Sequence, residues 1–431
     1  MKTCMVVLFL LATIATPQSA PSAAEIDAIY PDIEALYIDL HRTPELSLQE
    51  QKTAAKMADG LRRLGFEVTT GVGGNGVVGV LRNGSGPTVM VRTDMDALPV
   101  EEKTGLPYAS RVKVKDASGA EVGVMHACGH DVHMAAWMGT ARLLAGAKQR
   151  WRGTLVMIAQ PAEELVKGAR AMLDDGLFTR FPRPDFAVAI HDFNDLPAGK
   201  VGYVSGYMLA NVDTVDITIF GKGGHGAWPH TTVDPIVIAA RTIVSLQTIV
   251  AREIDPIDSA VITVGSIHGG TKHNIIPDEV RLQLTVRSFK DDVRKHLLSA
   301  IERVTRAEAA AAAAPTPPAV KITAGASATY NDPKLTTRLV TALRRSLGEA
   351  NVEEVSPKMG SEDFSEYGQA GVPAVMLWVG AADPAKLEAA KASGTSLPSL
   401  HSATFAPDRE RTLRTAIQAE TAAALELLGK P

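Results

Sequence analysis

The residues of this chain with the clearest chemical potential are one cysteine, two histidines and a pair of glutamates, namely Cys128, His130, Glu163, Glu164 and His191. A single glycine separates the first two, and each of the other three follows an apolar run that is typical of a buried strand. Thiolate, imidazole and carboxylate groups bind divalent transition-metal ions in proteins. The set therefore predicts a metal site.

The two adjacent glutamates suggest a division of labour. Glu163 and Glu164 follow the apolar run from Leu155 to Ala159, which ends before Pro161. Adjacent carboxylates that face the same way repel each other, and a divalent ion would remove that repulsion by binding one of them. The other would remain free as a general base. We therefore interpret the pair as one metal ligand and one base.

The size and charge of the chain limit its function. A chain of 431 residues is too long for one ordinary core, so we expect two domains. Its 44 basic and 48 acidic residues give a formal net charge of -4. Binding to nucleic acid or to an anionic membrane requires concentrated positive charge. The balance therefore argues against both partners and favours a small-molecule or peptide substrate.

The N-terminus has the pattern of a secretory signal peptide over residues 1–24. Lys2 precedes an apolar stretch from Met5 to Ala15, and small residues continue to Ala24, near which we expect cleavage. The apolar stretch is shorter than the roughly 20 residues of a membrane span. We expect an exported protein, periplasmic or secreted, with no membrane anchor after processing. An uncleaved anchor is the alternative.

The cysteine content also indicates metal binding. Cys4 would leave with the leader, so the mature chain would keep only Cys128. A lone cysteine in an exported protein cannot form an internal disulfide, so metal ligation is favoured over an inert buried thiol. Thiolate ligation favours zinc, although the histidine and carboxylate partners would also accept manganese, cobalt or nickel.

The segments that carry these residues predict an α/β catalytic domain with a mostly parallel sheet, formed by residues 25–208 and 326–431. A third apolar run ends at the sequence RTDMDALP, which places Asp94 and Asp96 just beyond a strand. Active sites of open α/β sheets lie outside the carboxyl ends of the strands. The repeated placement of acids and histidines at strand ends is what such a domain would show.

Residues 209–325 are interpreted as a smaller α+β domain inserted into the first. Strands are expected over 215–220, 260–267 and 280–289, with helices over 234–252 and 291–312. The run AEAAAAAAPTPPAV marks the end of the insert and is interpreted as a helix that continues into a proline-stopped loop.

Five motifs occur in a fixed order in this chain. They are CGHD at Cys128, QPAEE at Glu163, the histidine His191, GKGGHGAWPH around His225, and LHSATF with His401. Together they resemble the cocatalytic metallo-amidohydrolases and metallopeptidases related to aminoacylases and carboxypeptidase G, in particular the branch of hippurate hydrolases and auxin-conjugate amidohydrolases. The match covers nearly the whole mature chain, and the motifs are specific in combination.

The resemblance assigns roles to the catalytic residues. It implies two divalent metal ions per subunit, held by Cys128, His130, Glu164, His191 and His401. Glu163 would be the general base and acid, and Asp96 would orient a metal ligand. The wider family commonly has a histidine and a bridging aspartate where this chain has Asp94 and the CGHD segment.

The resemblance also implies that the insert is a lid or dimerisation domain. His225 would stabilise the oxyanion, and its flanking glycines would let the backbone approach the substrate. In the family this histidine often comes from the lid of a partner subunit, so a homodimer through the lid is expected. Asn274 and Arg287 resemble residues that hold the carboxylate or carbonyl of the substrate, and a guanidinium can bind a carboxylate with two hydrogen bonds. For Arg287, an ordinary surface ion pair is an open alternative.

The expected function is metal-dependent hydrolysis of an N-acyl amino acid, hippurate-like or a related amide, to a carboxylic acid and a free amino acid. A carboxypeptidase or dipeptidase of the same family, acting on short peptides, is the first alternative. A periplasmic binding protein without catalysis is an alternative from another class. Glu163 beside Glu164 argues against a binder, because a binder gains nothing from an acid that is not a ligand.

Several other polar residues have two open interpretations. His126 and His133 are expected to be supporting or surface histidines rather than ligands. Asp94 is interpreted either as a support for the site or as a strand-end cap. Glu362 and Asp363 either lie near the metal or substrate or belong to the start of a helix.

Overall fold

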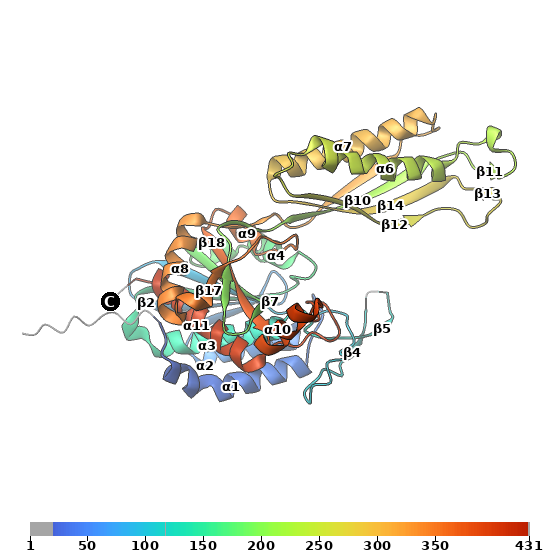
Figure 1. Ribbon diagram of the computed structural model, residues 1–431. Coiled ribbons are helices and arrows are strands. Elements are labelled where there is room, and N and C mark those ends of the chain that lie inside the picture. The colour runs from blue at the N-terminus through green and yellow to red at the C-terminus, as the bar shows by residue number, and fades with distance from the viewer. Residues whose placement is uncertain (1–19, 117, 430–431) are drawn as a thin grey trace, which may run out of the picture.

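The computed structural model describes residues 20–116 and 118–429. Two sheets dominate it, one of eight strands with helices on both faces and one of four strands with helices on one face (Figure 1). The four-stranded part extends away from the larger part (Figure 1). A larger α/β part with a mostly parallel sheet and an inserted α+β part agree with the predicted fold class.

The central strands of the larger sheet are parallel. Its order is β1-β2-β6-β3-β7-β18-β8-β17, and β6, β3, β7 and β18 run in the same direction. The strands are β1 (Glu67–Val72), β2 (Gly76–Asn83), β3 (Thr88–Asp94), β6 (Gly153–Gln160), β7 (Phe186–Pro197), β8 (Val201–Tyr203), β17 (Val352–Glu354) and β18 (Ala374–Ala382). Because helices cover both faces, the central strands are buried along nearly their whole length.

Two hydrophobic cores hold helices against this sheet. One face packs against α1 (Ala23–Arg42), α2 (Gln51–Arg63), α3 (His130–Gly146), α8 (Pro333–Leu347) and α11 (Arg409–Leu427). The other packs against α4 (Gly168–Asp174), α5 (Leu177–Arg180) and the region of α9 (Ser365–Gln369). Helix α2 begins at Gln51, after Leu48, whose left-handed φ of 68° a helix cannot include.

Smaller elements complete this part. They are α10 (Pro384–Ser393), the hairpin of β4 (Lys113–Lys115) and β5 (Glu121–Gly123), and 3₁₀ turns at Lys148–Arg150 and Glu349–Asn351.

The start of α1 bears on the predicted signal peptide, of which residues 1–19 lie outside the described residues. The Ser22 hydroxyl accepts a hydrogen bond from the Glu25 backbone N at 3.2 Å, and the Glu25 carboxylate accepts one from the Ser22 backbone N at 2.7 Å. This reciprocal capping box stabilises the helix, and the loss of such a cap costs about 1 kcal/mol. Cleavage after Ala24 would remove it, whereas cleavage before Ser22 would retain it.

The inserted part has its own core. Its antiparallel sheet has the order β12-β14-β10-β15, and α6 and α7 cover one face. The elements are β10 (Asn211–Phe220), α6 (Pro235–Glu253), β12 (Ala260–His268), β14 (Glu279–Ser288), α7 (Asp291–Ala311) and β15 (Ala319–Ala324). Strand β15 follows the proline-stopped run and has no counterpart among the expected strands, because it is an exposed edge strand without a clear apolar alternation.

Two short ribbons mark the ends of the insert. At its base, β9 (Gly206–Leu209) pairs with β16 (Thr329–Asn331), and this ribbon joins the insert to the larger part. At the far tip, β11 (Gly224–His225) pairs with β13 (Ile275–Ile276), next to a 3₁₀ turn at Pro229–Thr231 (Figure 1).

Helix α6 is the one helix within residues 20–116 and 118–429 that is long and apolar enough to cross a membrane. Its inner face includes Ile238, Leu246 and Ile249, which belong to the core of the inserted sheet. A core helix of this kind meets the same length and composition criteria as a membrane span.

Candidate metal centre

The predicted ligands meet just beyond the carboxyl ends of β3 and β6, beside His191, which lies within β7 because that strand continues to Pro197. A cavity of about 390 Å³ lies there, and its lining includes Cys128, Glu163, Glu164, His191, Arg287 and His401. Helix α3 begins directly after Gly129, whose left-handed φ of 74° lets the chain turn between Cys128 and His130. A β-carbon at Gly129 would lie 2.3 Å from an Asp192 carboxylate oxygen, so no larger residue fits.

The ligand atoms are spaced as they would be around metal ions. Cys128 Sγ lies 3.6 Å from His191 Nε2 and 3.2 Å from His401 Nε2. Glu164 Oε2 lies 3.5 Å from His401 Nε2, and Glu164 Oε1 lies 3.9 Å from His130 Nε2. Metal–ligand bonds of about 2.0–2.3 Å in a tetrahedral site separate the ligand atoms by roughly 3.3–3.8 Å. The structure thus brings all five predicted ligands together.

Backbone carbonyls fix the orientation of two imidazole rings. His130 Nδ1 lies 2.7 Å from the Asp96 carbonyl oxygen, and His191 Nδ1 lies 2.7 Å from the Asp192 carbonyl oxygen. Because each Nδ1 donates its proton to a carbonyl, each Nε2 keeps a lone pair. His130 Nε2 and Glu164 Oε1 are buried and have no hydrogen-bond partner within the described residues. Buried polar atoms are rarely left unsatisfied, so these two atoms fit a divalent ion.

The Asp96 carboxylate holds the glutamate pair by accepting hydrogen bonds from the backbone N–H groups of both glutamates. Its Oδ1 accepts a hydrogen bond from the Glu163 N at 3.1 Å, and its Oδ2 accepts one from the Glu164 N at 3.0 Å. The Ser47 hydroxyl donates to the same Oδ2 at 2.6 Å. Asp96 therefore positions the predicted base, one predicted ligand and, through its carbonyl, His130.

Strained backbone surrounds the same residues. Ala162 and Val166 flank the glutamate pair with left-handed φ values of 50° and 55°, and His401 has a φ of 66°. Such conformations cost non-glycine residues about 1–3 kcal/mol each and persist only where other contacts hold them. The Ala162 N donates to the buried Glu50 carboxylate at 2.9 Å, and the His401 N donates to the Ala127 carbonyl at 2.8 Å.

The electrostatics of the cavity favour a cation. Burial, followed by repulsion from Glu362 and Glu164, raises the pKa of Glu163 well above its usual value. Burial raises the pKa of Glu164 to about 7, and burial together with the charge of Glu164 raises the pKa of the Cys128 thiol. A dication placed among these groups would favour their ionised forms.

A buried arginine behind the cavity was missed by the sequence interpretation. Arg92 lies 2.6 Å from Asp94, 2.7 Å from Glu362 and 3.2 Å from Asp363, and all four side chains are buried. Asp94 also binds His133 Nδ1 at 2.8 Å. Asp94, Glu362 and Asp363 therefore belong to a network that supports the site. The signal was an arginine within the apolar run TVMVRTD, where a charge requires buried partners.

The other histidines behave as supports or lie on the surface. His133 contacts Asp94, as above, and Asp192. Burial alone would lower the pKa of His41, but its hydrogen bonds to Asp131 and Glu102 raise that pKa to about 10. His126 is buried, and its two ring nitrogens have no hydrogen-bond partner within the described residues.

The three residues predicted in the insert separate into two groups. Arg287 lines the cavity, and its Nη1 donates to the Met359 carbonyl at 2.8 Å. His225 and Asn274 are exposed at the far tip, where the Gly226 N donates to the Asn274 carbonyl at 2.8 Å. Among the described residues, the cavity lining includes neither of them. Of these three predicted residues, only Arg287 therefore lines the metal-centre cavity of its own chain.

Trp378 on β18 was also missed. It lines the cavity beside His191, with ring centroids 5.4 Å apart, and its buried Nε1 has no hydrogen-bond partner in the described part of the chain. A tryptophan within an apolar run was the available signal.

The model of the peptidase family M20/M25/M40 matches residues 90–403, a span that contains all five predicted ligands and the glutamate pair. The chain belongs to peptidase family M20/M25/M40. This membership confirms the predicted class of metal-dependent amide hydrolase, and a binding protein without catalysis is therefore not supported.

Relatives within the M20 family act on different amides. The chain is 38% identical over 329 residues to the N-acetyl-L-cysteine deacetylase of Bacillus subtilis, which covers 76% of this chain and 75% of the relative. It is also 38% identical to thermostable carboxypeptidase 1 of Saccharolobus solfataricus over 76% of this chain and 80% of the relative. The crystal structure of the Bacillus subtilis YXEP protein, described as a dinuclear metal-binding M20 peptidase, superposes with a TM-score of 0.74 at 30% identity, covering 93% of this chain and 100% of that one.

Proposed function

We propose that this protein hydrolyses N-acyl amino acids, hippurate-like or related amides, to a carboxylic acid and a free amino acid. The observation that carries the proposal is the shared cavity of Glu163, the metal-ligand cluster and Arg287. A half-buried guanidinium that faces the cavity suits a substrate with a free carboxylate, since it can donate two parallel hydrogen bonds. The N-acetyl amino acid named in one relative has such a carboxylate.

The ligand set suits two divalent ions, held by Cys128, His130, Glu164, His191 and His401. Bound there, such ions would polarise the amide carbonyl and make water more acidic near neutral pH. A thiolate and imidazoles favour zinc, and manganese, cobalt or nickel are compatible with the same ligands.

Glu163 would move the proton. Within the described residues, its carboxylate oxygens accept no hydrogen bond, and the nearest histidine atom, His130 Nε2, is 3.9 Å away. The carboxylate is thus free to accept a proton from the attacking water and to deliver it to the departing amine nitrogen.

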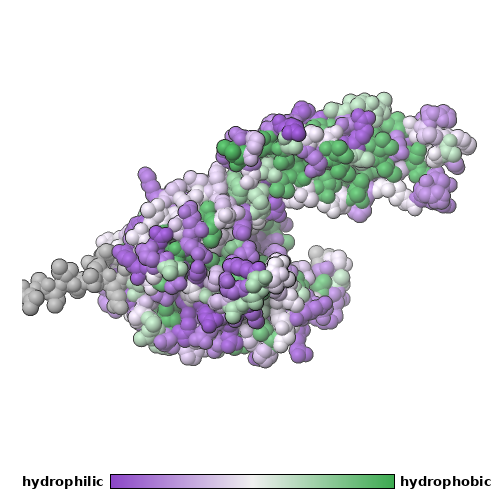
Figure 2. All heavy atoms as spheres, in the orientation of Figure 1, coloured by the Kyte–Doolittle hydropathy of each residue, from purple (hydrophilic) through white to green (hydrophobic). Residues whose placement is uncertain are grey.

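We further propose that the tip of a partner subunit completes the site. His225 and Asn274 do not line the cavity of their own chain, yet a histidine donor would stabilise the oxyanion. A homodimer through the insert would bring them there. Apolar side chains gather on the surface of the insert (Figure 2), and Ile236, Val237 and Val244 on α6 are 42%, 55% and 70% exposed. Among the strands of the described residues, β12 also has one edge without a pairing strand.

Export is a further proposal, supported by the leader-like pattern of residues 1–24. Mass spectrometry of the N-terminus in periplasmic and culture fractions of an expressing bacterium would test it. An intact Met1 in the cytoplasmic fraction alone would contradict it.

A panel of substrates tests the proposed activity. Purified protein loaded with Zn²⁺, Mn²⁺, Co²⁺ or Ni²⁺ should hydrolyse hippurate or N-acetyl amino acids, and a chelator should abolish the activity. Hippuramide, which lacks the carboxylate, should be hydrolysed at least about tenfold more slowly, and Arg287→Lys should remove most of that difference because it loses the two parallel hydrogen bonds.

Dipeptides in the same panel test the alternative, a carboxypeptidase or dipeptidase, which the second relative favours. A kcat/KM for dipeptides above that for every N-acyl amino acid would establish this alternative. Activity that survives metal removal, verified by metal analysis, would refute both functions.

A further inference from the structure

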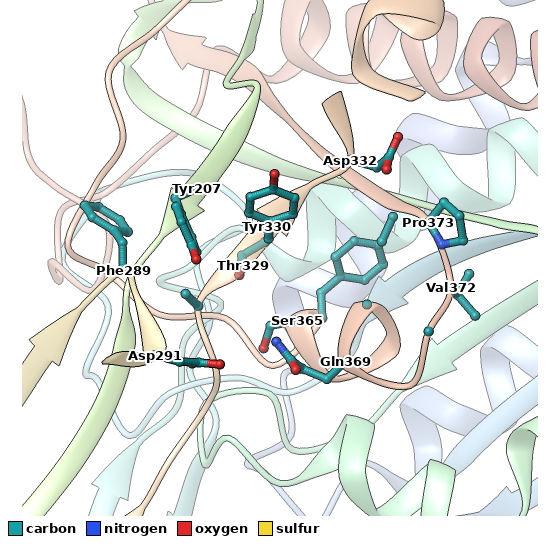
Figure 3. A pocket seen from close by; sticks show the side chains of 15 residues that line it. Tyr207, Phe289, Asp291, Thr329, Tyr330, Asp332, Ser365, Gln369, Val372 and Pro373 are labelled. Atoms are coloured by element: carbon teal, nitrogen blue, oxygen red, sulfur yellow. The ribbon is translucent and has the colours of Figure 1, made fainter. Parts of the chain in front are cut away.

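A second cavity lies at the ribbon that joins the insert to the larger part. Its volume is about 400 Å³, and 15 residues line it (Figure 3). None of them lines the metal-centre cavity. Small-molecule sites begin at about this size and combine an apolar wall with a few polar groups. We call it the ribbon cavity.

Three aromatic rings form one wall of the ribbon cavity. Tyr207 lies between the other two, with its ring centroid 5.0 Å from that of Tyr330 and 6.0 Å from that of Phe289. Tyr207 and Tyr330 meet edge to face at 75°. Figure 3 shows the three rings side by side at the same end of the cavity. Tyr330 is 46% exposed, so an aromatic surface remains open to a ligand.

The two charged residues that line the cavity are both acidic, and the basic residues Lys290 and Arg294 lie nearby, close to Tyr207 and Asp291 respectively. Asp291 and Asp332 line the cavity, and no lysine, arginine or histidine is present among its lining residues. The Asp332 carboxylate accepts a hydrogen bond from the Leu335 N at 2.8 Å and so caps α8. The Asp291 carboxylate, in contrast, accepts no hydrogen bond and lies in no close ion pair among the described residues, although Arg294 is near enough to be affected by its charge, and the carboxylate points toward Ser365 and Gln369 (Figure 3).

A buried hydroxyl provides an independent sign of a ligand. Ser365 is 5% exposed, and its Oγ is buried without a hydrogen-bond partner in the described chain. Buried hydroxyl groups normally have a partner. Ser365 lies across the cavity from the aromatic wall, next to Gln369, whose amide oxygen is a further acceptor (Figure 3).

We propose that the ribbon cavity binds a small organic ammonium ion, a primary amine carried on an apolar body. The ammonium group would lie between the Asp291 carboxylate and the Ser365 hydroxyl, and the apolar body would pack against Tyr207 and Tyr330. An ammonium donates up to three hydrogen bonds, which matches the acceptors Asp291, Ser365 and Gln369. Aromatic faces attract cations in addition, whereas an anion would be repelled by both aspartates.

The position of the ribbon cavity means that a ligand bound there could influence the metal centre through the placement of the insert. Its walls come from the insert (Phe289, Asp291), from the joining ribbon (Tyr207, Tyr330) and from the larger part (Ser365). A ligand held by all three would favour one placement of the insert relative to the larger part. One segment also reaches both cavities, because Glu362 lines the metal centre and Phe364 lines the ribbon cavity.

Isothermal titration calorimetry with three matched probes tests the proposal on the full-length, metal-loaded protein. The probes are 2-phenylethylammonium, the neutral 2-phenylethanol and the anionic 3-phenylpropanoate. The ammonium should bind at least about tenfold more tightly than the alcohol, and the anion should not bind in the ribbon cavity. Asp291→Asn and Tyr330→Ala should each weaken ammonium binding by about tenfold or more.

Asp292→Asn is the matched control. Asp292 is the next residue of α7, but it binds the N–H of Val293 and does not line the cavity. Its substitution should change the dissociation constant less than twofold. Circular dichroism would show that the variants retain the fold, and Asp291 is exposed enough that asparagine requires no repacking.

Three results would overturn the proposal. The first is the absence of ammonium binding at 10 mM probe, and the second is equal affinity for the ammonium and the alcohol. The third is binding that survives Asp291→Asn but is lost when hippurate is added, because that pattern would place the amine in the metal-centre cavity. None of these readouts depends on the catalytic activity.

Discussion

The metal centre and the tip of the insert are opposite in construction, although both carry residues predicted to act in one reaction. At the metal centre, Cys128, His130 and Glu163 are buried, and Asp96 fixes the backbone around them. At the tip, His225 and Asn274 are exposed on a two-stranded ribbon. A rigid region thus holds the groups that must keep their geometry, and an exposed region holds groups that must reach another surface.

This contrast suggests how the work is divided between subunits. Groups that bind ions and move protons need distances fixed to a fraction of an ångström, which burial and hydrogen bonds provide. Groups that contact the substrate from a partner subunit must be exposed on their own subunit before the two subunits associate. The following experiments test whether the two regions of different chains form one site, from the largest expected effect to the smallest.

Glu163→Gln should have the largest effect. It removes the proton carrier but keeps the shape of the side chain, so kcat should fall by roughly 10³-fold or more while metal content stays unchanged. Steady-state kinetics and elemental analysis of the purified variant measure the two quantities. Glu354→Gln, the same change at an exposed position of β17, is the control and should have no effect. Near-normal turnover of the Glu163 variant would assign the base elsewhere.

His225→Ala should lower kcat by about 10²-fold through loss of an oxyanion donor, again with unchanged metal content. His230→Ala, a histidine of the same exposed tip, is the matched control and should retain most of the activity. Equal losses in both variants would indicate a general effect of the tip on folding or assembly.

Mixing the two inactive variants then tests whether Glu163 and His225 of one active site come from the same chain or from two chains. In a hybrid dimer of Glu163→Gln and His225→Ala subunits, one site would combine an intact Glu163 with an intact His225 from the other chain. Refolding an equal mixture should therefore restore about a quarter of the wild-type rate, since half of the dimers are hybrids and each has one intact site. No recovery would mean that each chain uses its own tip.

Val244→Lys should disrupt the proposed dimer, because it places a charge on the 70% exposed apolar position of α6. Light scattering coupled to gel filtration should show a monomer, and kcat/KM should fall by about 10²-fold, as in His225→Ala, at nanomolar concentrations. Ser299→Lys introduces the same charge at an exposed position of α7 and should leave the dimer intact. A fully active monomer would contradict the shared site.

The smallest effect concerns stability near the metal centre. Glu420 on α11 is fully buried, and burial raises its pKa from 4.5 to about 8. The folded state therefore holds a proton that the unfolded state releases above pH 4.5, so stability should fall between pH 4.5 and about 8, by a few kcal/mol at most. Glu420→Gln should flatten this dependence in thermal melts at pH 5 and 8. An unchanged slope would show that other groups cause it.

The strands and their ends could be predicted from sequence because period and composition reveal them. Asp96, Glu163 and His191 follow apolar runs. The structure places Asp96 and Glu163 just beyond β3 and β6, whereas His191 lies within β7, which continues to Pro197. His401 could be found only through motif order, since it lies in an irregular segment far along the chain. Local sequence pattern alone does not predict where in the fold such a residue lies.

Other features depend on contacts that no local pattern encodes. The left-handed turn at Ala162 contains no glycine, and the carboxylate that stabilises it belongs to Glu50, more than 100 residues earlier. Arg92 required knowledge of partners from the segment that contains Glu362. The placement of His225 away from its own cavity depends on the length and direction of β10 and β14, which only the assembled insert defines.

The position of β18 has a consequence for biosynthesis. This strand pairs with β7 in the middle of the eight-stranded sheet, yet the ribosome produces it only after the whole insert. Until then, the growing chain exposes the edge of β7, the strand that carries His191, as an open template for unwanted pairing. The insert can fold on its own core during this interval, whereas the half-made larger sheet would benefit from a chaperone.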